Sequence, residues 1–225
     1  MHPIMIPFQN PTIYFGTLRI DEPISALTDI LLCAVCFFAF FKTKSLAIHK
    51  AINLYRWFFM FTGVSTLAAA LIGHAFLYYF GFNAKMIGWV FGMLGVSFAV
   101  FASMYHTRPI IGNFVFKRLV LINSIEAVIS LIVVFWAWSF VVVEIHAAFG
   151  LLLNIAVLEY IHFQKTKSAL SIRLLYGITI AIISVIAHIF TFASSVWFNH
   201  IDLSHVLMTL SIYVMYKGVS AYRKP

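Results

Sequence analysis

Charged residues are scarce in this 225-residue chain: Asp, Glu, Lys and Arg together make up 10% of it, against 63% hydrophobic residues. Soluble globular domains contain about 25% charged residues, which cover much of their surface. The mean hydropathy of +0.98 points the same way. The composition therefore excludes a soluble domain and predicts an integral membrane protein.

Cysteine is almost absent, since Cys33 and Cys36 are the two in the chain. Their C-x-x-C spacing lies inside an apolar run, without further cysteines for a metal site or a disulfide framework. We interpret both as packing residues. The first 18 residues lack Lys and Arg and are interrupted by three prolines, so no cleavable signal peptide is predicted.

Long apolar runs are abundant. A hydrocarbon core about 30 Å thick is crossed by about 20 helical residues. Runs of that length are predicted at residues 23–42, 56–81, 86–107, 118–140, 142–164, 169–193 and 202–222. The fourth and fifth are separated near Trp138-Ser139. The predicted fold is an all-α, seven-transmembrane-helix bundle that forms one domain, residues 23–225, after a short outer segment, residues 1–22.

Positive charge predicts the orientation, because Lys and Arg are retained on the cytoplasmic side of short loops. With seven crossings, one side carries only Arg19 and Lys85. The other side carries Lys42, Lys44, Lys50, Arg56, Arg108, Lys117, Arg118, Lys165, Lys167, Arg173, Lys217, Arg223 and Lys224. The N-terminus is therefore predicted outside and the C-terminus in the cytoplasm, across the cell membrane if the source is bacterial. The net charge of +8 then reflects topology and attraction to anionic lipids, with no need for a nucleic acid partner.

Ionisable residues inside the apolar runs are expected to share one depth, near the outer interface. Such residues cost several kcal/mol each unless they face a partner or a water-filled cavity, so a group of them predicts a functional site. The predicted layer consists of Asp29, His74, His146, His188, Asp202 and His205, with Glu22 above it.

The strongest local pattern is Asn199-His200-Ile201-Asp202-Leu203-Ser204-His205. Asp202 and His205, at i and i+3 on one helix face, can offer an oxygen and a nitrogen to one zinc ion, with His74 as the third ligand. Asp202 can equally be the N-cap of the seventh helix, and Asn199 an earlier cap. His200 is expected to line the site from the loop.

Three places in the sequence resemble a superfamily of seven-span membrane hydrolases that includes the alkaline ceramidases and the progestin and adipoQ receptors. Glu22-x-x-Ser25-x-x-x-Asp29 has the spacing of a first-helix Glu-x-x-Asn-x-x-x-His motif, His74 lies near the end of span two, and His205 near the start of span seven. The resemblance implies a zinc ion held by three histidines and a water that attacks a lipid amide or ester. Ser25 would line such a site.

Two family positions differ, because Ala70 replaces a serine and Ile201 replaces the first histidine of the seventh-helix pair. The chain also resembles an uncharacterised group of bacterial membrane proteins with Glu-Pro and Leu-Thr-Asp in the first helix and Asn-His-x-Asp-x-x-His before the seventh. In the hydrolase hypothesis, Asp29 is the general base and Asp202 is a ligand or orients one.

Two other classes of function stay open. Histidines from facing helices can hold haem, and His146 and His162, with His74 and His106 opposite, are spaced for it. A non-enzymatic receptor, channel or lipid-binding protein would use the same polar groups as a hydrogen-bond network, which Glu126 also fits. Membrane lipids are the predicted partners in every case, and the oligomeric state is not predicted.

Overall fold

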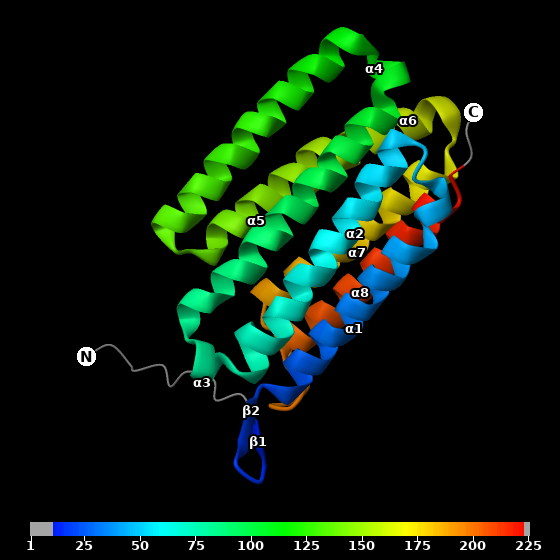
Figure 1. Ribbon diagram of the computed structural model, residues 1–225. Coiled ribbons are helices and arrows are strands. Elements are labelled where there is room, and N and C mark those ends of the chain that lie inside the picture. Colours follow the sequence, from blue (N-terminus) through cyan, green and yellow to red (C-terminus); the bar gives the residue numbers. More distant parts are fainter. Residues whose placement is uncertain (1–10, 223–225) are drawn as a thin grey trace.

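The computed structural model describes residues 11–222, and most of them are helical (Figure 1). The elements, in chain order, are β1 (Thr12–Phe15), β2 (Leu18–Asp21), α1 (Pro23–Lys42), η1 (Lys44–Leu46), α2 (Lys50–Ala68), η2 (Ala69–Ala75), α3 (Leu77–Phe80), η3 (Phe82–Ala84), α4 (Lys85–Ala137), α5 (Phe140–Ala148), η4 (Phe149–Ala156), α6 (Val157–Thr166), α7 (Ala169–Ile189) and α8 (His200–Ser220). The all-α prediction is confirmed for the bundle. The N-terminal antiparallel hairpin, in which Thr12 pairs with Asp21, was not predicted.

Within residues 11–222, five helical stretches are long and apolar enough to cross a membrane. They are Pro23–Lys42, Lys50–Ala75, Phe82–Ala137, Phe140–Thr166 and Ala169–Ile189. Helix α8 has 21 residues but is less apolar, because its first two turns carry His200, Asp202 and His205. The helical positions agree with the predicted spans to within a few residues, except that α2 begins six residues before the predicted residue 56.

The longest helix, α4, contains two predicted spans. Its 53 residues are interrupted at Gly112, where φ is 77° and ψ is 162°, three residues after Pro109. The chain reverses there, so α4 consists of two antiparallel limbs, Lys85 to Ile111 and Asn113 to Ala137 (Figure 1). The predicted break near Trp138-Ser139 is confirmed, because α4 ends at Ala137 and Ser139 is the N-cap of α5.

The two ends of the bundle differ in charge. The Gly112 turn, the α6–α7 connection and the end of α8 lie at one end, while the β-hairpin and α3 lie at the other (Figure 1). All described Lys and Arg residues except Arg19 and Lys85 lie in or near the connections of the first end. We call the two ends the basic end and the hairpin end.

Small residues bring the helices into close contact. Ser211 Oγ in α8 donates to the carbonyl of Gly177 in α7 at 2.7 Å, and Ser65 Oγ in α2 donates to the carbonyl of Gly88 in α4 at 2.8 Å. The second limb of α4 instead exposes large apolar side chains, which are Leu121, Ile122, Ile125, Val128, Ile129, Ile132 and Phe135. Such a continuous apolar surface suits contact with lipid rather than water.

Candidate functional site

At the hairpin end, one carboxylate and two imidazoles meet from three segments. Asp29 lies in α1, His74 in η2 and His205 in α8. One nitrogen or oxygen atom from each lies within 4.8 Å of the other two. Asp29 Oδ2 is 3.6 Å from His74 Nε2, and Asp29 Oδ1 is 3.6 Å from His205 Nε2. We call these three residues the outer cluster.

A π-helical segment presents His74 to the cluster. In η2 the backbone N–H of Phe76 donates to the carbonyl of Leu71, five residues earlier, at 2.9 Å. A π-turn holds one more residue than an α-turn and rotates the side chains that follow it. The Nδ1 atom of His74 forms a short hydrogen bond with Glu22 Oε2. Because a carboxylate accepts, His74 donates from Nδ1 and turns Nε2 toward Asp29.

Thr28 orients the second imidazole in the same way. Thr28 Oγ1 is 3.1 Å from His205 Nδ1 and 3.0 Å from the carbonyl oxygen of Ile24. The hydroxyl proton goes to the carbonyl, which can only accept, so His205 donates at Nδ1. Its Nε2 atom also faces Asp29. Metal-binding histidines are oriented in this way, by a partner on the nitrogen that does not bind the ion.

Asp29 supplies the third potential ligand. Its residue is 2% exposed, and its Oδ2 atom has no hydrogen-bond partner among the described residues. The 3.6 Å separations from the two Nε2 atoms are too long for hydrogen bonds. Two ligands at 2.0–2.2 Å from a tetrahedral zinc ion lie about 3.3–3.6 Å apart. The spacing therefore fits a shared metal ion better than direct hydrogen bonds.

Asp202 lies beside this cluster but caps α8 instead of joining it. Asn199 Oδ1 accepts from the backbone N–H groups of Ile201 and Asp202, and Asp202 Oδ2 accepts from the N–H of Asn199 at 2.7 Å. Asp202 Oδ1 accepts from Ser25 Oγ at 2.6 Å. Both carboxylate oxygens are thus engaged in a capping box that joins α8 to α1. The N-cap of α8 is therefore Asn199, and Asp202 is the third helical residue of the box instead of the predicted N-cap. The group of potential ligands contains Asp29 instead of Asp202.

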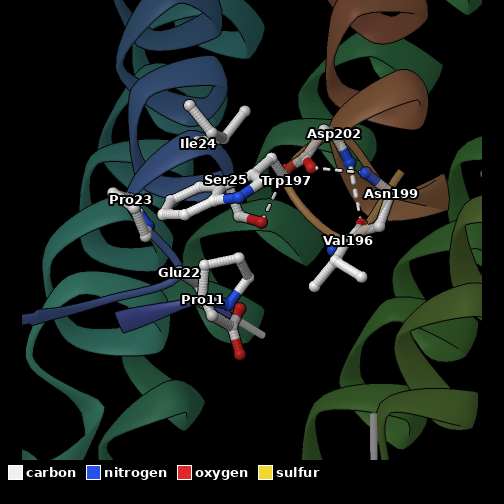
Figure 2. Close-up of a pocket in the computed structure, with 9 residues that line it drawn as sticks. All are labelled: Pro11, Glu22, Pro23, Ile24, Ser25, Val196, Trp197, Asn199 and Asp202. Carbon is white, nitrogen blue, oxygen red and sulfur yellow. Dashed lines mark hydrogen bonds between the residues drawn. The ribbon is translucent and has the colours of Figure 1, made fainter. Parts of the chain in front are cut away.

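A narrow crevice lies next to the cluster (Figure 2). It is lined by Pro11, Glu22, Pro23, Ile24, Ser25, Val196, Trp197, Asn199 and Asp202. Figure 2 shows Ser25 and Asp202 facing each other across it, from α1 and α8. Glu22 both lines the crevice and contacts His74, so it connects the crevice to the outer cluster.

Three other predicted site residues lie outside the outer cluster. His146 contacts Glu126 through Nδ1 at 2.8 Å, and its Nε2 atom donates to the carbonyl of Met93 at 3.0 Å. It therefore forms a separate pair with α4. The rings of His188 and His200 contact each other with centroids 5.2 Å apart, and among the described residues neither histidine belongs to the outer cluster.

Two of the histidines considered for haem contact each other directly. The ring centroids of His106 and His162 lie 4.0 Å apart, and the ring planes are tilted by 38°. Axial haem ligands instead point their nitrogens at the iron from opposite sides of the porphyrin. The arrangement of His106 and His162 gives the haem hypothesis no support.

Glu159 is a fully buried carboxylate near the basic end that contacts His106, and it was not predicted as a site residue. The signal was present in the spacing. Glu159-x-x-His162 and Ser103-x-x-His106 each place a pair at i and i+3 on one helix face inside an apolar run.

No curated protein and no solved structure matches the chain. The model of one protein family matches residues 24–224. This range includes nearly all of the described helices and all three residues of the outer cluster. The chain therefore belongs to DUF6962, a family of unknown function.

Proposed function

We propose that this protein is a zinc-dependent membrane hydrolase that cleaves a lipid amide or ester at the outer end of its helix bundle. The observation that supports this most is the outer cluster itself. A buried carboxylate oxygen without a hydrogen-bond partner among the described residues faces two imidazoles whose Nδ1 atoms are both engaged elsewhere. Such a donor set, with two nitrogens and one oxygen, is typical of catalytic zinc.

The proposed topology has seven crossings with the N-terminus outside. The crossings would be α1, α2 with η2, the two limbs of α4, the α5–η4–α6 stretch, α7 and α8. The basic end then faces the cytoplasm, in agreement with the retention of Lys and Arg on that side. The outer cluster lies at the opposite end, so the proposed substrate bond lies at the level of the outer-leaflet headgroups.

In the proposed mechanism, three side chains hold the zinc ion and a fourth accepts a proton. Bound zinc would supply an activated water and polarise the substrate carbonyl. Asp29, His74 and His205 would hold the ion, so Asp29 is a ligand here and no longer the general base. Glu22 lines the crevice as well as contacting His74, and we assign it the role of proton acceptor.

The crevice suits a lipid headgroup linkage rather than a whole lipid. Apolar residues such as Ile24, Val196 and Trp197 line it. Trp197 is 53% exposed, as expected for a tryptophan at a membrane interface. The acyl chains would stay in the surrounding bilayer.

The test is hydrolysis of a panel of lipid amides and esters by protein that has been purified in detergent without a chelator at any step. The proposal expects turnover by the wild type, loss of turnover after zinc removal, and recovery on adding zinc back. His205→Ala and Asp29→Asn should lack activity, whereas Glu144→Gln, at an exposed position of α5, should retain it. No turnover by zinc-loaded wild type, or turnover unaffected by zinc removal, would contradict the proposal.

A further inference from the structure

A second group of potential ligands lies near the basic end, away from the outer cluster. It contains Glu159 and His162 of α6 and His106 of the first limb of α4. One nitrogen or oxygen atom from each lies within 4.8 Å of the other two. We call this group the inner cluster. No residue of it takes part in the function proposed above.

Four donors hold the Glu159 carboxylate inside the inner cluster. Its Oε1 atom accepts from Ser103 Oγ at 2.6 Å and from Tyr55 OH at 3.2 Å. Its Oε2 atom accepts from Ser171 Oγ at 2.7 Å and from His106 Nδ1 at 3.0 Å. With three hydroxyl donors and one imidazole donor, the carboxylate is ionised and its acceptor sites are largely used. Glu159 therefore orients His106, as Glu22 orients His74.

The hydrogen bonds also fix the tautomer of His162. Ser171 Oγ lies 3.0 Å from His162 Nδ1, but its proton already goes to Glu159. Thr166 Oγ1 lies 3.1 Å from the same nitrogen, and its proton goes to the carbonyl of His162. Both hydroxyls can only accept from the ring, so His162 donates at Nδ1. Its Nε2 atom is then unprotonated.

The Nε2 atoms of His106 and His162 have no hydrogen-bond partner in the part of the chain that the structure describes. Their ring centroids lie 4.0 Å apart, and the ring planes are tilted by 38°. His106 is 8% exposed and His162 is partly buried, four residues before the end of α6 at Thr166. Two imidazoles with unpartnered Nε2 atoms thus lie side by side near the basic end, next to the buried Glu159 carboxylate.

From this arrangement, we propose that the inner cluster is a second metal site, which binds a zinc-like divalent cation through His106 and His162. Imidazole nitrogens suit zinc, copper and nickel, and exclude magnesium and calcium as preferred ions. Glu159 is a positioning residue, and its charge offsets that of the cation. With two protein nitrogens and water in the remaining positions, the site is weaker and more exchangeable than the three-ligand outer cluster.

Equilibrium dialysis of detergent-purified protein against micromolar free zinc tests the second site. The wild type should bind about two zinc ions per chain. His106→Ala and His162→Ala should each bind one, His205→Ala should also bind one, and the double variant His162→Ala/His205→Ala should bind none. Glu159→Gln should weaken the inner site by about 10- to 100-fold, as loss of an orienting carboxylate does.

The chain offers a matched control at the same end. His49 is the N-cap residue of α2, is partly buried, and contacts the ring of Tyr222 at 5.1 Å without belonging to the inner cluster. His49→Ala should therefore keep both ions. Retention of the outer ion in His162→Ala would show that this variant is folded.

Two results would overturn the second site. One is a wild-type stoichiometry that His162→Ala and His106→Ala leave unchanged, which would place the zinc elsewhere. The other is that the His205→Ala variant loses all of the zinc that the wild type binds. Failure of the outer site looks different, because the wild type would then hold one ion that is lost in His162→Ala and kept in His205→Ala.

Discussion

At the scale of single residues, the account depends on which nitrogen of each imidazole faces Asp29. Glu22 contacts Nδ1 of His74 and Thr28 contacts Nδ1 of His205, so both Nε2 atoms face Asp29. In a membrane, a buried carboxylate requires a partner that offsets its cost. In the function that we propose, a bound cation is that partner.

Glu22→Gln should weaken zinc binding at the outer cluster by about 10- to 100-fold, because an amide orients His74 less firmly and adds no negative charge. The measurement is competition for zinc against a chromophoric chelator, with Glu144→Gln as the control carboxylate. Unchanged affinity in Glu22→Gln would show that Glu22 does not orient a ligand.

Asp202→Asn should lower stability without removing zinc. Both oxygens of Asp202 accept hydrogen bonds, and an amide keeps only one acceptor, so the loss is expected to be about 1–3 kcal/mol. Thermal unfolding in detergent, followed on the same samples as their zinc content, checks this. Loss of zinc from folded Asp202→Asn protein would make Asp202 a ligand after all.

The sequence predicted several residues of the site, but it did not predict which of them are potential metal ligands and which make other contacts. His74 and His205 were expected in one layer because of their positions within the spans, and the structure brings their rings together. Asp29, and not Asp202, is the aspartate among the potential metal ligands. Part of the reason is the hydrogen bond from Ser25 to Asp202, which are 177 residues apart, so no local sequence pattern reveals it. For the same reason, the Glu126 contact of His146 was not predicted.

At the scale of elements, two irregularities shape the molecule. The π-helical segment η2 turns His74 toward α1 and α8, and the Gly112 turn folds α4 into two limbs. Neither changes the hydrophobic pattern much. The sequence therefore located the helices well, while the π-turn, which needs only one extra residue in a turn, left no signal.

Gly112→Ala tests the turn within α4. With φ of 77° and ψ of 162°, Gly112 occupies backbone space that other residues adopt only at a cost of about 1–3 kcal/mol. A Cβ there would meet no atom within 4 Å, so the loss of stability would come from the backbone alone. Thermal unfolding should show a lower midpoint for Gly112→Ala and little change for Lys117→Ala, an exposed position nearby. Equal midpoints would contradict the strained turn.

At the scale of the whole molecule, carboxylate and histidine pairs occur at three places along the bundle. Glu22 contacts His74 at the hairpin end, Glu126 contacts His146 through α4 and α5, and Glu159 contacts His106 near the basic end. The chain has only seven Asp and Glu residues. The few acidic side chains within the apolar helices are thus used almost entirely to hold imidazoles or to cap α8.

The proposed orientation predicts which end reacts with a membrane-impermeant thiol reagent. Thr17→Cys, in the hairpin, should be labelled on intact cells, and Asn113→Cys, beside the Gly112 turn, only after permeabilisation. Cys33 and Cys36 are at most 5% exposed and serve as an unreactive background. The reverse pattern would invert the topology and place the outer cluster on the cytoplasmic side.

The most direct test of the central claim is the zinc X-ray absorption spectrum of zinc-loaded His162→Ala protein, in which the inner cluster is disabled. The account predicts one zinc per chain, with nitrogen and oxygen ligands at 2.0–2.2 Å, two of them imidazoles, and loss of that ion in His162→Ala/His205→Ala. Well-folded protein that holds no zinc, or zinc that remains after His205→Ala is added, would contradict it.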